Sequence, residues 1–139
     1  MKKFNVTIPI KPVTKARPRV LRKGWAYTPK KTLDYEKAIA EYWRQATHDF
    51  QYSREQAIVV NLSFGLPIPK NTSKKKTALM DAGNIPHIKK PDADNLAKAV
   101  MDALNKVAWV DDSQVIKVSI HKKYSKEPYV YIYIHDEVE

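Results

Sequence analysis

The chain begins with a short alternation of apolar and polar residues. Phe4, Val6 and Ile8 alternate with polar neighbours before a proline, and a period of two residues is typical of a strand with one buried face. A β-branched run at 58–60 opens a second stretch, "AIVVNLSFGLP", which continues in alternation until two prolines interrupt it. The pattern predicts a β-strand at each of these places.

Two other segments have the apolar spacing of a helix. In "TLDYEKAIAEYWRQATHDF", residues 32–50, apolar side chains recur near helical spacing and good helix formers fill the gaps. From Leu96 to Val107 the apolar residues follow i, i+3, i+4 and i+7, as in an amphipathic helix. Both segments are predicted to be α-helices.

The segments between these elements are rich in cations. No period lasts through "PVTKARPRVLRKGWAYTPKK", residues 12–31, so we expect a basic arm with a short hairpin around Lys23-Gly24. The long insert between Pro67 and Pro91 is predicted to hold a lysine-rich helix that begins after Ser73 and ends at Gly83. Connections this long are uncommon in compact domains unless they have a function.

The C-terminal part alternates twice, in "QVIKVSIHKKYS" and "YVYIYIHDE", with a turn between them. We expect an antiparallel hairpin that closes the sheet. The predicted order is therefore β-α-β-α-β-β, an α/β (α+β) fold with a small mixed sheet and helices packed on one face. With 139 residues, the chain has the length of a single domain spanning 1–139.

The charge balance favours an anionic partner. Lys and Arg number 25 against 15 Asp and Glu, a formal net charge of +10, which suits nucleic acid or an anionic surface. A well-solvated surface is the ordinary alternative. Without Cys, disulfides and thiolate metal sites are excluded. No apolar run is long enough for a signal peptide or a membrane span, so a cytoplasmic location is expected.

Acidic residues lie at both ends of the second predicted helix. Asp92 and Asp94 precede it, and Asp111 and Asp112 follow it. Aspartate is common at a helix start, so the simplest interpretation is that one of the first pair is an N-cap. Only one residue can be the N-cap, and two carboxylates two positions apart favour a cation between them. Lys98 or a divalent metal would supply that charge.

A metal site requires the two acid pairs to meet. A helix of this length is about 20 Å long, so Asp111 and Asp112 would have to fold back across the sheet edge. Three or four carboxylates would then form an oxygen site suited to Mg²⁺ or Mn²⁺. Such a metal activates water for attack on a phosphodiester. Lys98 would orient that water or neutralise a phosphate oxygen.

At these residues the sequence resembles a known family. "KPDADNLAKAVMDALNKVAWVDDSQV", residues 90–115, is similar to the P-D-x-D-N-L-x-K … D-A-L … D-D-x-Q-V signature of the RusA Holliday junction resolvases. These are small dimeric endonucleases of bacteria and of phages or prophages, and weaker similarity covers most of the chain. The resemblance implies a RusA-like fold and a homodimer that resolves four-way junctions by paired symmetric nicks in DNA recombination and repair.

The resemblance also assigns roles to single residues. It implies that Asp92, Asp94 and Asp112 are the catalytic carboxylates that bind Mg²⁺, with Mn²⁺ as a substitute, and that Lys98 is the catalytic lysine. Asp111 matches the first acid of the D-D pair and is expected as a further ligand. Some members have an arginine where this chain has Pro91; its role would pass to the preceding lysine.

Cations of the arm and the insert are predicted to contact DNA phosphates, with binding that weakens as salt rises. The predicted DNA-binding residues are Lys15, Arg17, Arg19, Arg22, Lys23, Lys74, Lys75, Lys76, Lys89 and Lys90. Trp25 and Tyr27 are available to stack on bases unpaired at a branch point, but packing against the core is the preferred interpretation.

Two alternatives remain at this point. The chain would be a non-catalytic basic DNA- or RNA-binding module if Asp92 were only a cap, in which case Asp92→Asn would lower stability and Mg²⁺ would change nothing. It would be a nuclease of the same chemistry with another substrate if it acted on replication forks or flaps instead.

Overall fold

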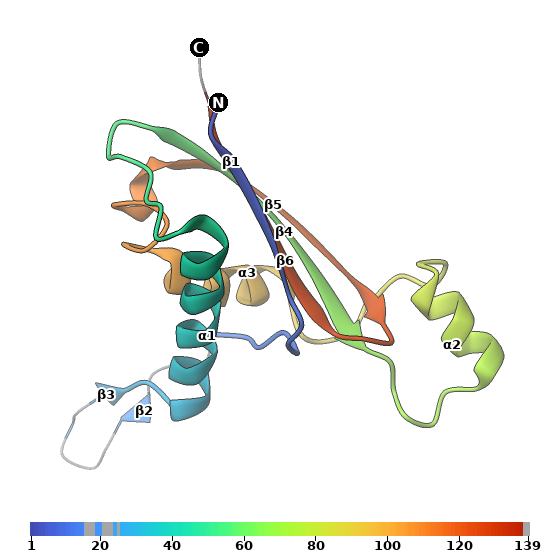
Figure 1. The fold of residues 1–139 in the computed structure, drawn as a ribbon. Coiled ribbons are helices and arrows are strands. Elements are labelled where there is room, and N and C mark those ends of the chain that lie inside the picture. Colours follow the sequence, from blue (N-terminus) through green and yellow to red (C-terminus); the bar gives the residue numbers. More distant parts are fainter. Residues whose placement is uncertain (16–18, 21–23, 25, 138–139) are drawn as a thin grey trace.

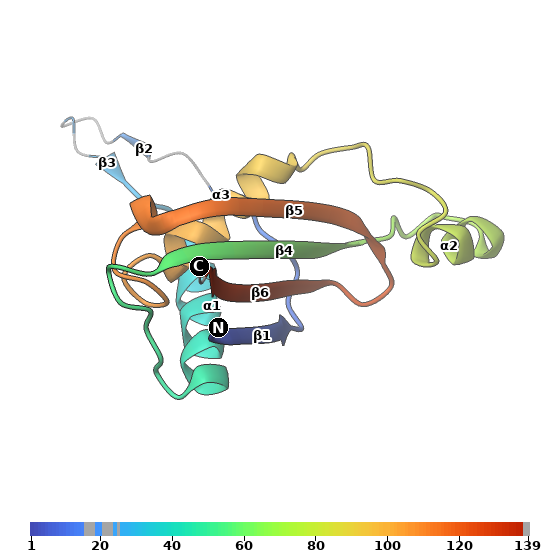
Figure 2. The same cartoon turned by 90° about the horizontal axis from the view of Figure 1, so that it is seen from above.

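A four-stranded sheet forms the centre of the protein, with the order β1-β6-β4-β5. The computed structural model describes residues 1–15, 19–20, 24 and 26–137, without the side chains of 19–20. The strands are β1 (Lys3–Ile8), β4 (Ala57–Pro67), β5 (Val115–Ser125) and β6 (Tyr129–Glu137). Strand β6 runs antiparallel to β1 and β4, whereas β4 and β5 are parallel (Figure 2). The sheet is mixed, as predicted.

Two helices cover one face of this sheet. Figure 1 shows α1 (Lys30–Thr47) and α3 (Ala93–Leu104) on the same side of the strands. Their apolar residues, among them Trp43 and Leu96, form one buried cluster with alternate residues of β4 such as Phe64. The predicted fold class is therefore confirmed. Within the described residues, no helix has the length and apolar character needed to cross a membrane.

The third helix, α2 (Lys74–Asp81), lies at the far end of the molecule, where Asp81 accepts a hydrogen bond from the Lys126 backbone nitrogen at 2.8 Å just after β5 (Figure 1). As predicted, Ser73 is its N-cap, and its side chain accepts a hydrogen bond from the Lys76 backbone nitrogen at 3.2 Å. Gly83 has a φ of 83° just beyond its end, a conformation that glycine adopts without strain. The insert thus forms an outlying basic helix.

The basic arm contains the predicted hairpin. Strands β2 (Arg19–Val20) and β3 (Ala26–Tyr27) pair antiparallel, and Gly24 between them has a φ of 84°. Tyr27 is 45% exposed, so the preferred interpretation that it packs against the core was wrong. Trp25 lies outside the described residues.

The prediction that β5 and β6 pair as a hairpin was wrong, because β4 lies between them. Strand β4 buries side chains on both faces, with Val59 5% exposed and the neighbouring Val60 fully buried. A strand that is apolar on both faces is stable only in the interior of a sheet. The two C-terminal strands therefore pair with β4 from opposite sides.

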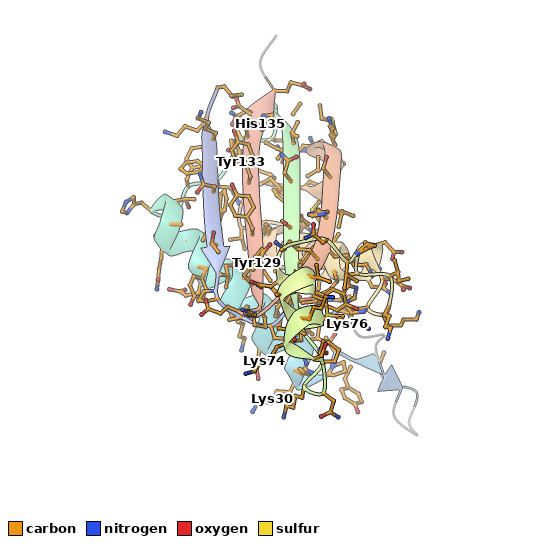
Figure 3. All side chains as sticks on the ribbon, turned by 90° about the vertical axis from the view of Figure 1, so that its right-hand side faces the viewer. Lys30, Lys74, Lys76, Tyr129, Tyr133 and His135 are labelled. Carbon is orange, nitrogen blue, oxygen red and sulfur yellow. The ribbon has the colours of Figure 1, made fainter. Side chains whose placement is uncertain are left out.

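The second face of the sheet is not covered by α1 or α3 (Figure 1). It presents Tyr129, Tyr133 and His135 from β6, as Figure 3 shows. Gly65 of β4 lies opposite Tyr129, and a Cβ built on this glycine would be only 2.3 Å from the tyrosine ring. Glycine is thus required here because the Tyr129 ring occupies the position of a side chain.

We expect Gly65→Ala to destabilise the protein by about 1–3 kcal/mol, because the added methyl group forces the Tyr129 ring out of its place. Denaturant unfolding followed by tryptophan fluorescence measures this loss. In a Tyr129→Ala background the same change should cost much less. An equal cost in both backgrounds would show that the ring contact is not the cause.

Candidate active site

Asp92 and Asp94 lie at the start of α3, whose apolar side packs on the sheet. Leu96 and Val100 are fully buried, which leaves Asp92, Asp94 and Lys98 exposed. Asp92 occupies the N-cap position, but its side chain makes no capping hydrogen bond. The Lys90 ammonium lies 3.3 Å from its Oδ2 instead. Asp92 therefore has the position of a helix cap, as expected, but its side chain lacks the hydrogen bond that a cap makes.

Lys98 follows Asp94 by one helical turn and is exposed. Within the described part of the chain it makes no ion pair with Asp94 or another carboxylate. Asp92 and Asp94 lie where the unpaired backbone N–H groups of the helix favour negative charge. The start of α3 thus offers two exposed carboxylates and one exposed ammonium group.

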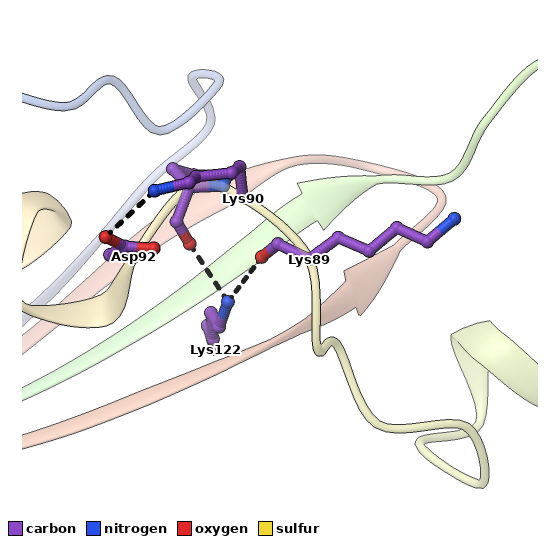
Figure 4. A network of polar contacts seen from close by, with 5 residues as sticks. Lys89, Lys90, Asp92 and Lys122 are labelled. Atoms are coloured by element: carbon purple, nitrogen blue, oxygen red, sulfur yellow. Dashed lines mark hydrogen bonds and ion pairs between the residues drawn. The ribbon is translucent and has the colours of Figure 1, made fainter.

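Lys122 of β5 holds the segment that leads into α3. Its Nζ donates hydrogen bonds to the carbonyl oxygens of Lys89 at 2.7 Å and Pro91 at 2.9 Å (Figure 4). These bonds join the segment before α3 to β5, which follows α3 in the chain. The edge strand of the sheet therefore sets the position of the residues next to Asp92.

The second acid pair is bound into a turn at the other end of α3. Asp112 accepts a hydrogen bond at 2.8 Å from Nε1 of Trp109, a fully buried core residue. Asp111 caps the 3₁₀ turn η1 (Asp112–Gln114) by accepting from the Ser113 backbone nitrogen at 2.9 Å. Hydrogen bonds from the side chain and backbone of Ser113 hold the pKa of Asp111 below its ordinary value.

Gln114 organises the same turn from inside. Its side-chain oxygen accepts from the backbone nitrogens of Val110 and Asp111 at 2.8 and 3.0 Å. Its amide nitrogen donates to the carbonyls of Ser53 and Gln56 at 2.8 and 2.9 Å. The buried glutamine thus satisfies backbone groups from two loops. The D-D-x-Q-V part of the signature, residues 111–115, therefore has a structural role here.

The structure does not bring the two acid pairs together within one chain. Helix α3 has 12 residues and is about 18 Å long. Strand β5 separates the same two regions by about 23 Å, since seven residue steps of about 3.3 Å lead from Val115, next to η1, to Lys122, next to Pro91. Within the described residues, no three His, Asp or Glu side chains are placed to share a metal ion.

The first pair alone still suits a hard cation. Mg²⁺ is commonly held by one or two carboxylates, while waters and substrate phosphates fill its remaining positions. Asp92 and Asp94 are exposed and free of capping bonds, so their oxygens meet this minimum. Asp111 and Asp112 of the same chain do not reach this site.

The predicted DNA-binding cations have different surroundings. Lys74, Lys75, Lys76, Lys89 and Lys90 are exposed. Lys15 is half-buried and pairs with Glu36 at 2.5 Å and Asp102 at 3.2 Å. Burial lowers the pKa of Lys15, but hydrogen bonds to these two carboxylates outweigh it and raise the pKa above its ordinary value. Lys15 therefore ties the arm to the helices α1 and α3.

Several predicted contacts lie outside the described residues. Arg17, Arg22 and Lys23 are among them, and Arg19 is described only by its backbone in β2.

Sequence reasoning missed Lys122 and His87. The partners of Lys122 are backbone carbonyls, which leave no signal in a sequence. A lone histidine in a loop has no distinctive pattern either, but His87 is half-buried and lies against Tyr124 with ring centroids 4.5 Å apart. Its Nδ1 is buried and has no hydrogen-bond partner among the described residues.

The comparisons with known proteins agree with this architecture. A family model described as endodeoxyribonuclease RusA matches residues 9–135, so the chain belongs to this family of DNA-cleaving enzymes. Nucleases of the family are metal-dependent. A protein of Bacillus subtilis (strain 168), "Uncharacterized protein YqaN", is 34% identical over 142 residues, which cover 96% of each chain.

We expect Lys122→Met to loosen the segment that leads into α3, because the variant keeps the apolar stem but loses both donors. The free energy of unfolding should fall by only about 1 kcal/mol, while hydrogen exchange at residues 88–90 becomes faster. Lys123→Met is the matched control, since Lys123 makes no such bonds within the described residues. Equal exchange in both variants would contradict the role of Lys122.

Proposed function

We propose that this protein is a Mg²⁺-dependent, structure-selective endodeoxyribonuclease that resolves Holliday junctions by paired symmetric nicks. The observation that carries the proposal is the pair Asp92 and Asp94, exposed and free of capping bonds at the start of α3, in a chain of the RusA endodeoxyribonuclease family. Mn²⁺ is expected to replace Mg²⁺, because both favour carboxylate and water oxygens.

Each exposed group at the start of α3 has a role in this proposal. Asp92 and Asp94 would hold the metal, and a bound metal would supply an activated water and stabilise charge on the phosphodiester. Lys98 neutralises a non-bridging phosphate oxygen from one turn further along the helix. Lys90, whose side chain is 87% exposed, partly balances the charge of Asp92 before DNA arrives.

Lysines that precede the acids in the chain would hold the DNA backbone. Lys89 and Lys90 precede the acids directly, and α2 carries Lys74, Lys75 and Lys76 on a helix that projects from the sheet (Figures 1 and 3). Within the described residues Lys89 and the three α2 lysines make no ion pair, whereas Lys90 pairs with Asp92. Exposed ammonium groups suit phosphate contacts. A projecting basic helix extends the surface along which the arm of a branched DNA would lie.

A homodimer fits this substrate, because a four-way junction has approximate two-fold symmetry and paired nicks require two sites. The edge strand β5 supports an association between copies. Its apolar side chains Ile116, Val118 and Ile120 are 57%, 39% and 37% exposed, and an edge strand also presents unpaired backbone groups.

The dimer also gives Asp112 a place in the proposed site. The two acid pairs of one chain lie about 18 Å apart or more along α3, so one metal cannot contact both. We therefore propose that Asp112 of a second copy joins Asp92 and Asp94. Asp111 keeps its role in the turn and is left out of the metal site.

We expect Asp94→Asn to reduce cleavage of an immobile four-way junction by at least about 100-fold, because the metal loses one carboxylate, while junction binding in EDTA is kept. Gel analysis of the labelled strands measures both. Flap, fork and plain duplex substrates run in parallel identify the preferred branched structure. Retained cleavage by a contaminant-free variant would contradict the proposal.

The second candidate function, a non-catalytic basic binding module, predicts a different result. Under it Asp92 is only a cap, so Asp92→Ala should lower the melting temperature and Mg²⁺ should have no effect on the DNA. The missing capping bond of Asp92 argues against this function.

Mixing two inactive variants tests whether the Asp112 of each site comes from the second copy. Refolding Asp94→Asn together with Asp112→Asn should restore nicking to about a quarter of the wild-type rate, because half of the dimers then have one intact site. The nicks should be unpaired. Asp94→Asn mixed with Asp92→Asn is the control and should stay inactive, since both changes affect the same end of α3. No restoration in the first mixture would contradict a shared site.

A further inference from the structure

A cleft of about 410 Å³ lies directly beside the acids. Its walls come from the segment after β1, the first turn of α1, the end of β4 and the segment that leads into α3, and they include Lys90 and Pro91 next to Asp92. The volume is within the range of small-molecule sites. None of the residues that line this cleft is acidic.

Three lysines bring positive charge to the cleft: Lys11, Lys31 and Lys90. Lys90 is partly neutralised by Asp92. In the part of the chain that the structure describes, Lys11 and Lys31 make no ion pair with a carboxylate. They come from distant parts of the chain, and like charges that converge without a counter-ion favour an anionic ligand.

His87 adds a neutral donor to the same wall. Its buried Nδ1 has no hydrogen-bond partner among the residues that the structure describes, and an unpaired acceptor lone pair is less costly there than an unpaired N–H. We therefore assign the proton of the neutral ring to Nε2. Burial, followed by the charge of Lys122, holds the pKa of His87 below its ordinary value, so the ring is neutral at pH 7.

We infer that this cleft binds a backbone phosphate of the DNA strand that passes Asp92 and Asp94. In this arrangement Lys11 and Lys31 neutralise the phosphate, and Nε2 of His87 donates a hydrogen bond to one of its oxygens. The Tyr124 ring holds the imidazole from the other side. The inference rests on the proposed nuclease function and names one phosphate site within its DNA contacts.

The test measures binding of a labelled immobile four-way junction in EDTA, where no cleavage occurs, as a function of salt. Lys31→Ala should lower the slope of log affinity against log salt by about 1, because one phosphate contact is lost. His87→Ala should weaken binding about tenfold without changing the slope, since it removes a neutral donor. His87→Gln, which keeps an N–H donor, should recover part of the affinity.

The matched control is Lys37→Ala, which removes the same charge from α1 at an exposed position outside the cleft. Thermal unfolding of each variant confirms that it is folded. The inference is overturned if Lys31→Ala and His87→Ala bind like Lys37→Ala. The proposed nuclease function itself is overturned if the wild-type protein binds no DNA at low salt, so the two failures are distinct.

The free phosphate anion carries the same chemical group as the DNA backbone, and inorganic phosphate tests whether the cleft binds that anion instead. At constant ionic strength, replacing chloride with millimolar phosphate should leave junction binding by the wild-type protein unchanged, because several DNA contacts act together with this one. Stabilisation of the wild-type protein against thermal unfolding by phosphate, absent in Lys31→Ala, together with equal junction binding by the two proteins, would assign the cleft to the free anion and overturn the inference.

Discussion

The parallel pairing of β4 with β5 is the constraint on which the rest of the structure depends. Parallel neighbours cannot be joined by a tight turn, so the chain from 68 to 114 must return from the end of β4 to the opposite end of the strands, where β5 begins. The crossover places α3 on the covered face, with its start near the end of β4 and its end near the start of β5. The acids before and after α3 are separated for the same reason.

This separation divides the quoted signature into two parts with different physical roles. The acids at the start of α3 have exposed oxygens and no capping bond. The acids after it accept hydrogen bonds from Trp109 and Ser113, and the buried Gln114 completes their turn. The signature of residues 90–115 thus combines two exposed carboxylates before α3 with a turn that fixes where the chain enters β5. A site that uses both halves requires two copies of the chain.

The basic residues also have separate roles that their number alone does not reveal. Lys15 is half-buried between two carboxylates and holds the arm on the helices. Lys122 uses its donors on backbone carbonyls and positions the entrance of α3. The exposed lysines of the cleft and of α2 remain available for an anion. Burial and local partners, rather than charge count, distinguish structural lysines from binding ones.

By itself, the sequence determined the local elements of this protein. The two apolar periods placed β1, β4, α1 and α3, while Ser73 and Gly83 marked the limits of α2, because these signals depend on residues near each other in the chain. The position of Asp92 and Asp94 at the start of α3 was predicted in the same way. Only the tertiary structure decided that β4 separates β5 from β6, that Asp112 lies far from Asp92, and that His87 lies in a basic cleft. Each of these depends on contacts between distant segments, which an alternation or a spacing does not encode.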